Sequence, residues 1–396
     1  MKMKKTVLVS LVLGLFLCGL LVAQNSTARE EYIKAMTSSD VNQRASLLKD
    51  WISKYGGKGQ ENENFANATL CLLPYQGKTS AETIKYGERA LELGNLDAST
   101  QCQVLINLAS IYTKQGQNLD KAVSYGSQVI QTAESAKNSS QDSKSADAWN
   151  KMIGAGYYTQ AQAMKKAGNF KGSIDKYISS YEILKNKQII SEVANLGKTL
   201  YDKKQYSDAA KAFKTANDVL NNFATTSFYA KALHRSGNKD EALKYYKQAF
   251  SKQKSGEVAY NTGILLASKA ESDPSLLDEA VEYLLYASFL SKANSEKAMK
   301  LAEGLYFSTK SDYNEKVKQL ATKAEELEEL TNTFNEKFGE KTEEDLSNKE
   351  KKELEKMRKE ITALQETIEQ LQSEQTEELD EFKALIEEIK KKLGIE

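Results

Sequence analysis

Small and bulky apolar residues recur at fixed spacings through the middle of the chain. Ala230 is followed by Ala242, Tyr246 and Ala249, at distances of 12, 16 and 19 residues. A Gly-Asn pair at 237–238 lies between them, where one helix is expected to end and the next to begin. Small residues let two antiparallel helices approach closely, and larger residues four positions along fill the flanking grooves. The pattern therefore predicts a helical hairpin.

The same spacing occurs in further stretches of the sequence. Four consecutive copies begin at Ala161, Gly197, Ala230 and Gly263, which are 36, 33 and 33 residues apart. One hairpin cannot bury both of its faces, so hairpins repeated at such a period stack into a solenoid. The copies pair Gly197 with Ala209, Phe213 and Ala216; Ala161 with Ser173, Tyr177 and Ser180; Cys71 with Thr83, Gly87 and Ala90; and, with longer turns, Gly263 with Ala280, Leu284 and Ala287, and Ala109 with Ala122, Gly126 and Val129.

These residues resemble the tetratricopeptide repeat (TPR). The resemblance implies an all-α fold, namely a TPR-like helical-hairpin solenoid followed by a coiled-coil arm. It also implies a non-enzymatic scaffold that binds a protein or peptide partner through the concave face, which the first helix of each hairpin lines. Carrying that face over by position gives these candidate partner-binding residues: Tyr158, Lys165, Asn195, Lys198, Tyr201, Lys231, His234, Arg235, Tyr260 and Asn261.

Lysine and tyrosine dominate this candidate face, which favours an extended acidic peptide as the partner. Ala194 and Ser227 stand where the family's carboxylate-binding arrangement has larger polar donors, so a C-terminal peptide ligand is not implied. The alternative is an ordinary solvated helix surface, because basic residues are common throughout the repeats.

The first 28 residues predict a targeting signal. Lysines precede an uninterrupted apolar run from Thr6 to Ala23. The run is long for a signal peptide and short for a membrane span, so cleavage is favoured and an uncleaved membrane anchor is the alternative. Both outcomes export the rest of the chain, so the predicted location is periplasmic or secreted, with a membrane link only through an uncleaved N-terminus.

Three regions are predicted beyond the signal: capping helices at 29–60, TPR-like repeats at 61–310 and a coiled-coil arm at 311–396. Apolar residues recur at three and four positions in the arm, with Gly339 interrupting them. The first series is Val317, Leu320, Ala324, Leu327, Phe334 and Phe338, and the second is Leu354, Met357, Ile361, Leu364, Ile368, Leu371, Phe382, Leu385 and Ile389.

Two arrangements of the arm follow from the unequal lengths of these series. In the first, the arm folds into an antiparallel hairpin, and the end of the longer helix reaches back to cover the last repeat. In the second, a continuous helix self-associates as a parallel dimer. The second arrangement belongs to an alternative function, in which the protein is a structural or oligomerising envelope component whose coiled coil is the active part.

Composition supports long helices and offers little chemistry. Only 2 of the 396 residues are proline, and acids and bases balance at 55 each; the arm is acidic and the repeats are mildly basic. The one histidine, His234, cannot form a histidine cluster for a metal. Residues 154–156 (Gly-Ala-Gly) lack the third glycine and the preceding strand of a dinucleotide loop, so they predict small packing residues within a helix. No metal, cofactor, catalytic site or nucleic-acid partner is expected.

Two cysteines follow the signal, Cys71 and Cys102. Cys71 occupies the small-residue site of its repeat, which favours a buried free thiol. A disulfide between the two is the alternative in an exported protein.

Overall fold

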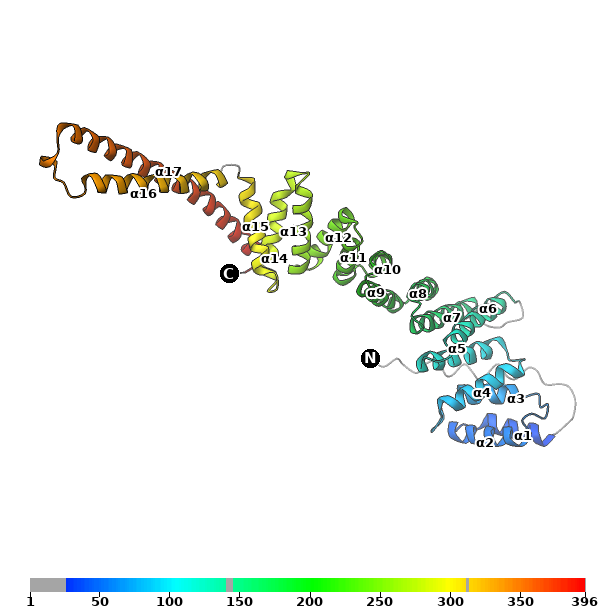
Figure 1. Ribbon diagram of the computed structural model, residues 1–396. Helices are drawn as coiled ribbons and strands as arrows, with labels where there is room; N and C mark the ends of the chain where they lie inside the picture. Colours follow the sequence, from blue (N-terminus) through cyan, green and yellow to red (C-terminus); the bar gives the residue numbers. More distant parts are fainter. Residues whose placement is uncertain (1–25, 140–144, 311–312, 396) are drawn as a thin grey trace. The chain divides into compact units, whose positions relative to one another are not determined.

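The described part of the chain is all-α (Figure 1). The computed structural model describes residues 26–139, 145–310 and 313–395, where seventeen α-helices and two short 3-10 helices follow one another. The predicted all-α fold of helical hairpins is confirmed. Of the predicted signal segment, residues 1–25 lie outside the described residues. None of the described helices combines the length and apolar character that a membrane crossing requires.

The helices divide into two compact units, Met1–Ile189 (unit 1) and Ile190–Glu396 (unit 2). In unit 1, consecutive helices pack as hairpins, and α5, α6 and α7 also pack on one another. Polar side chains cap several helix starts, as Thr79 and Glu82 do in a capping box at α4. The helices are α1 (Ser26–Thr37), α2 (Val41–Tyr55), α3 (Glu63–Leu72), α4 (Ser80–Leu93), α5 (Ala98–Gln115), α6 (Leu119–Lys137), α7 (Ala146–Lys166) and α8 (Phe170–Leu184).

Glycines hold α6 and α7 unusually close. A Cβ atom placed on Gly156 would lie 3.0 Å from the carbonyl oxygen of Gly126 and 2.8 Å from Ile130, and one on Gly126 would lie 3.0 Å from the carbonyl oxygen of Gly156. Each glycine therefore faces the backbone of the other helix. Residues 154–156 are small packing residues in a helix, as the sequence predicts.

Both cysteines of unit 1 are free and buried. Burial raises the pKa of Cys71 to about 11 and that of Cys102 to about 12, so both thiols stay protonated near neutral pH. The Cys71 sulfur fills the small-residue site opposite Gly87. The free-thiol prediction is confirmed.

Unit 2 continues the hairpin pattern from α9 (Lys187–Asp202), whose first residues belong to unit 1. Ala230, Ala242, Tyr246 and Ala249 are each at most 1% exposed, as expected for the sites of closest packing between the two helices of a hairpin. Gly237 ends the first of these helices with a φ of +92°, which glycine adopts readily. The other helices are α10 (Tyr206–Leu220), α11 (Phe223–Arg235), α12 (Lys239–Lys252), α13 (Gly256–Ala270) and α14 (Leu277–Leu290), with the 3-10 helix η1 (Pro274–Leu276) before α14.

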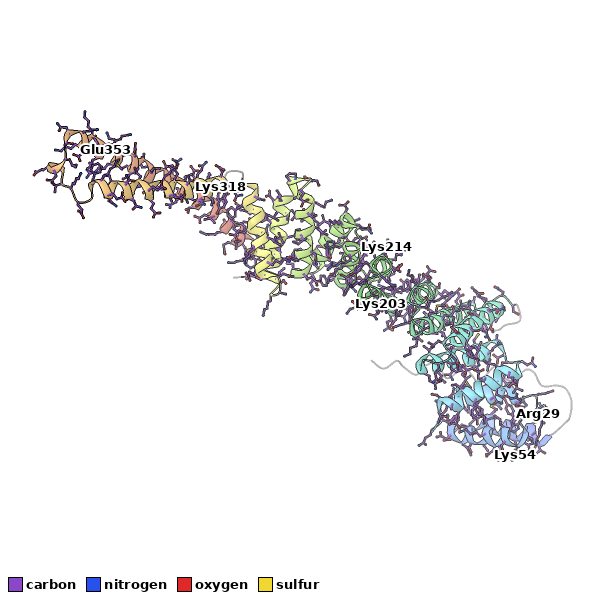
Figure 2. The ribbon with its side chains drawn as sticks, viewed as in Figure 1. Arg29, Lys54, Lys203, Lys214, Lys318 and Glu353 are labelled. Atoms are coloured by element: carbon purple, nitrogen blue, oxygen red, sulfur yellow. The ribbon has the colours of Figure 1, made fainter. Side chains whose placement is uncertain are left out.

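The C-terminal arm is an antiparallel helical hairpin attached to α15 (Ser295–Thr309). It consists of α16 (Tyr313–Phe338) and α17 (Asn348–Leu393), which pack together (Figure 1). Lys337 pairs with Glu353, which Figure 2 labels, and Lys316 pairs with Glu374. Lys316 lies 21 residues before Lys337 in α16, and Glu374 lies 21 residues after Glu353 in α17, so the two helices run antiparallel. Of the two arrangements that the helix lengths left open, the described residues form the antiparallel hairpin.

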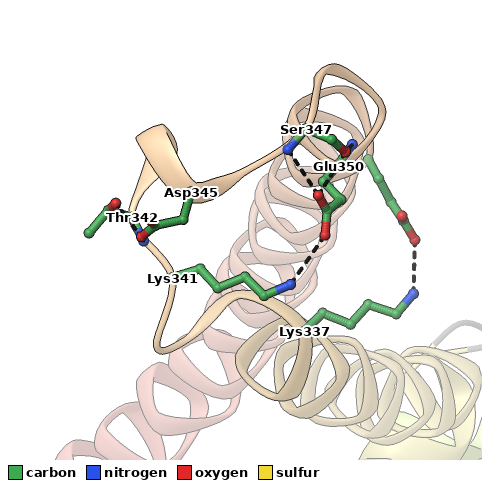
Figure 3. Close-up of polar contacts among 7 residues, drawn as sticks. Lys337, Lys341, Thr342, Asp345, Ser347 and Glu350 are labelled. Carbon is green, nitrogen blue, oxygen red and sulfur yellow. Dashed lines mark hydrogen bonds and ion pairs between the residues drawn. The ribbon is translucent and has the colours of Figure 1, made fainter.

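Local polar contacts shape the turn between the two arm helices (Figure 3). The Glu350 carboxylate accepts hydrogen bonds from the backbone N–H and hydroxyl of Ser347 and pairs with Lys341. These contacts, led by the Ser347 hydroxyl, lower the pKa of Glu350 to about 2. Thr342 and Asp345 close the short 3-10 helix η2 (Glu343–Asp345) in the same way. The turn therefore starts α17 with a capping box.

The last turns of α17 extend beyond α16 and pack on α14 and α15. Phe382 lies against Tyr306 and Phe307, with ring centroids 4.9 and 5.6 Å apart, and Ile389 is fully buried. Lys392 pairs with Glu282 of α14 at 3.0 Å. This segment, Glu381–Leu393, is called the arm tail below. It covers the end of the last hairpin, as predicted.

The α16 face that meets α17 differs from the predicted one. Val317 is 40% exposed and Ala324 is also exposed, whereas Lys316 and Leu330, which the predicted series lacked, are partly buried. The predicted Leu320 is partly buried as expected. A lysine can pack its methylene stem in such a seam while its ammonium group reaches a carboxylate, as Lys316 does with Glu374. The seam prediction missed this because it considered apolar residues alone.

Candidate functional site

The first helices of the unit 2 hairpins carry most of the predicted binding residues. Their exposed or half-buried side chains form what is called here the first-helix face, from α9, α11, α13 and α15. Contacts connect each of these helices to the next, as described below. The face comprises Asn195, Lys198, Tyr201, Phe228, Lys231, His234, Arg235, Glu257, Tyr260, Asn261, Ile264 and Lys297.

Phe228 joins α9 to α11 on this face. Its ring stacks on Phe213 of α10, with centroids 5.3 Å apart, which fixes its orientation. The ammonium groups of Lys198 and Lys231 lie 5.9 and 5.1 Å from the centroid of Phe228. The electron-rich ring face attracts both cations, and the two distances place the ammonium groups no more than about 11 Å apart.

The two lysines differ in their acidic neighbours. Lys231 Nζ pairs with Glu257 Oε1 of α13 at 2.7 Å, and the lysine side chain is 17% exposed. Lys198 is exposed and, within the described residues, has no carboxylate partner. The face therefore presents one cation that already holds a carboxylate and a second that is available.

Arg235 and Tyr201 provide a second link between α9 and α11. The interaction of their side chains is the largest influence that raises the pKa of Arg235 above its ordinary value. Next to it, His234 lies edge-on to Tyr246 with centroids 6.0 Å apart. Burial lowers the pKa of His234, and the charges of Arg235 and Lys239 lower it further. His234 is therefore neutral near pH 7 and adds no charge to the face.

Tyr260 and Lys297 extend the face to α15. The Lys297 ammonium lies 5.6 Å from the Tyr260 centroid. Asn261 donates through Nδ2 to the carbonyl oxygen of Glu257 in its own helix, so part of its hydrogen-bonding capacity is used locally. The aromatic-cation pairing found at Phe228 thus recurs at the other end of the face.

The predicted residues do not all lie in one unit. Tyr158 and Lys165 belong to α7 in unit 1, and Tyr158 packs edge-on against Tyr177 of α8, with centroids 5.5 Å apart. The other eight belong to unit 2. Those eight residues are the members of the predicted set that share one unit.

Phe228 was missed by the sequence prediction, which instead weighed Ser227. Ser227 is 5% exposed, whereas Phe228 contacts both lysines. The signal was present in the spacing, because Phe228 stands 33 residues after Asn195 and 33 before Asn261. Successive helix residues are 100° apart, so a shift of one position selects a different face.

Unit 1 contains a separate pocket of about 510 Å³ between α2, α3 and α4. Its buried carboxylate, Glu63, pairs with Arg89 at 3.0 Å and accepts a hydrogen bond from Gly57 N–H. Glu88 at its edge accepts from Tyr112 and Tyr125 and pairs with Lys121. The acidic groups are thus already satisfied. In the described residues, no three His, Cys, Asp or Glu side chains are grouped as a metal site would require.

Comparison with known proteins gives fold likeness only. No protein-family model matches the sequence, and no curated protein matches it either. Similar solved structures include a tetratricopeptide repeat protein from Parabacteroides merdae (13% identity, 70% of this chain, 100% of that chain, TM-score 0.35). The apo form of RapI is also similar (12% identity, 72% of this chain, 99% of that chain, TM-score 0.36). So is YrrB, described as a TPR protein with an unusual peptide-binding site (17% identity, 55% of this chain, 97% of that chain, TM-score 0.31). The peptide binding is a property of YrrB; the hairpins and buried small residues above establish the fold of this chain.

Proposed function

We propose that this protein is a non-enzymatic scaffold that binds an acidic segment of a partner protein on the first-helix face of unit 2. The observation that carries the proposal is the pair of ammonium groups, Lys198 and Lys231, beside the ring of Phe228. An acidic side chain placed between them is attracted by both charges, and the ring offers apolar contact area to the neighbouring residues of the segment.

Charge on the rest of the face is consistent with this partner class. Arg235 and Lys297 add positive charge on either side of the lysine pair, and Tyr201 and Tyr260 add aromatic surface. Because exposed charges are screened over about 8 Å at physiological ionic strength, binding should weaken as salt is added.

Charge reversal tests the proposal. In the variant Lys198→Glu with Lys231→Glu, protein captured from an extract of the native source should fall to background, because both attractive charges become repulsive. The matched control is Lys214→Glu with Lys247→Glu on the second helices α10 and α12; Figure 2 labels Lys214. Like Lys231, Lys247 pairs with a glutamate on a neighbouring hairpin, Glu279, at 2.7 Å. Lys214 pairs with Asp218 at 2.9 Å, so the control creates at least as much local repulsion as the test variant.

Two results decide the matter, once circular dichroism shows that both variants remain helical. Loss of capture in the first variant alone supports the first-helix face. Equal capture by the wild type and the first variant over a salt series removes the face from consideration.

A second candidate function is self-association through the arm. It is favoured by the middle of the arm seam, where Leu320, Leu327, Ile361 and Ile368 remain partly exposed in the two-helix hairpin. Sedimentation of the wild type against Ile361→Asn tests it. A dimer that dissociates in the variant supports self-association, and a monomer at all concentrations excludes it.

Export is part of the proposal and is supported by the sequence of residues 1–23. We expect the protein outside the cytoplasm, with or without the signal attached. Fractionation of the native source with N-terminal sequencing tests this, since a cytoplasmic chain that keeps Met1 contradicts it.

A further inference from the structure

The Lys231–Glu257 ion pair occupies the middle of the first-helix face, and its two members are held very differently. Lys231 is 17% exposed and packs over Phe228, whereas the Glu257 side chain is 60% exposed. Glu257 lies in the first turn of α13, where the helix dipole favours a negative charge even without a lysine partner. The ammonium group is therefore built into the face, and the carboxylate can leave at little cost.

We infer that Glu257 is an internal competitor, whose carboxylate occupies Lys231 in the free protein and is displaced by a carboxylate of the acidic partner. The inference rests on the proposed function and describes how that site is regulated. Exchanging one carboxylate for another at Lys231 brings little net gain, because the new ion pair replaces a similar one.

Competition by Glu257 acts on segments with at least two neighbouring acids. A first acid can pair with Lys198, which has no carboxylate partner among the described residues, whereas a second acid must displace Glu257 from Lys231. Both ammonium groups face the same Phe228 ring, so nearby acids of one segment can reach both. A segment with a single acid can pair with Lys198 and leave Glu257 in place.

The test is Glu257→Gln, which removes the competing charge and keeps the size and a hydrogen-bond acceptor. The probe is a short labelled peptide of alternating glutamate and serine, with a single-glutamate version beside it. An exposed ion pair contributes little, so removing it should tighten binding of the first peptide by about two- to fivefold. The single-glutamate peptide should gain less, because it can pair with Lys198 in both proteins. The matched control is Glu279→Gln, which breaks the Lys247–Glu279 pair of the second helices and should leave binding unchanged.

Each result has a definite meaning. Tighter binding in Glu257→Gln alone supports the inference. Unchanged or weaker binding in that variant, while Lys198→Glu with Lys231→Glu abolishes binding, overturns the inference and leaves the proposed function standing. If neither wild type nor Glu257→Gln binds the alternating peptide, both are wrong. An equal gain in Glu279→Gln also overturns the inference, because the effect is then one of net charge.

Discussion

The contact between α6 and α7 gives a prediction in which the same substitution has different effects on stability at two sites. Replacing a helical glycine by alanine normally stabilises a helix by about 1 kcal/mol, because alanine has the higher helix propensity. At Gly304 of α15 a Cβ atom has open space around it. Gly304→Ala should therefore stabilise by about 1 kcal/mol.

Alanine at position 156 has the same gain in helix propensity, but its Cβ atom has no open space. Its Cβ would lie 2.8 Å from Ile130 and 3.0 Å from the carbonyl oxygen of Gly126, and the backbone oxygen cannot rotate away as a side chain can. Overpacking of this kind costs about 1 to 3 kcal/mol. Because the propensity gain cancels between the variants, Gly156→Ala should be less stable than Gly304→Ala, each relative to wild type, by about 1 to 3 kcal/mol.

Tryptophan fluorescence can follow the unfolding of unit 1 specifically. The two tryptophans of the chain, Trp51 and Trp149, are both in unit 1, and both are almost completely buried. Denaturant unfolding followed by their fluorescence thus reports on the unit that contains Gly156, and far-ultraviolet circular dichroism follows Gly304→Ala. Equal stabilisation by the two substitutions would refute the close α6–α7 contact.

Three further predictions concern unit 2. Gly197→Leu should destabilise the fold of unit 2 by about 1 to 3 kcal/mol or more, because even a Cβ atom there would lie 3.2 Å from Ala212 and Phe213. An unchanged melting temperature would show that the repeat register is wrong. Phe382→Ala should cost about 3 kcal/mol of arm-tail packing and speed hydrogen exchange of the tail. The exposed-site control Lys383→Ala should leave that exchange unchanged. A tail equally protected in both variants would contradict its docking. The pKa of His234 should lie below its ordinary value of 6.5, so stability is lost as pH falls through the unfolded-state pKa. The chain has one histidine, so its imidazole proton resonances can be followed directly and should show a titration midpoint under 6.5. A midpoint at or above 6.5 contradicts the burial of His234.

Sequence spacing predicted the hairpins because close helix packing leaves a strong mark on residue size. Ala230 and Ala242 could be placed at a helix crossing without coordinates, since only small residues fit there. The helix lengths predicted the arm hairpin as one of two possible arrangements. Both predictions depend on distances along the chain, which the sequence gives directly.

The details of the binding face depend on helix rotation, which spacing alone fixes less closely. Phe228 replaced Ser227 on the face through a shift of one residue. Lys316 entered the arm seam in place of Val317 because its stem is apolar although its end is charged. The ion pair of Lys231 with Glu257 joins two hairpins, and no local sequence pattern predicts it.

The central claim is that a partner lies on the first-helix face of unit 2. Photo-crosslinking tests it most directly, with Asn195→p-benzoylphenylalanine on that face and Lys214→p-benzoylphenylalanine on the second helix α10. Asn195 is exposed, and so is the Lys214 side chain, so neither replacement disturbs the core. The account predicts a covalent adduct with the captured partner from position 195 and none from position 214. An adduct from position 214 alone would contradict it.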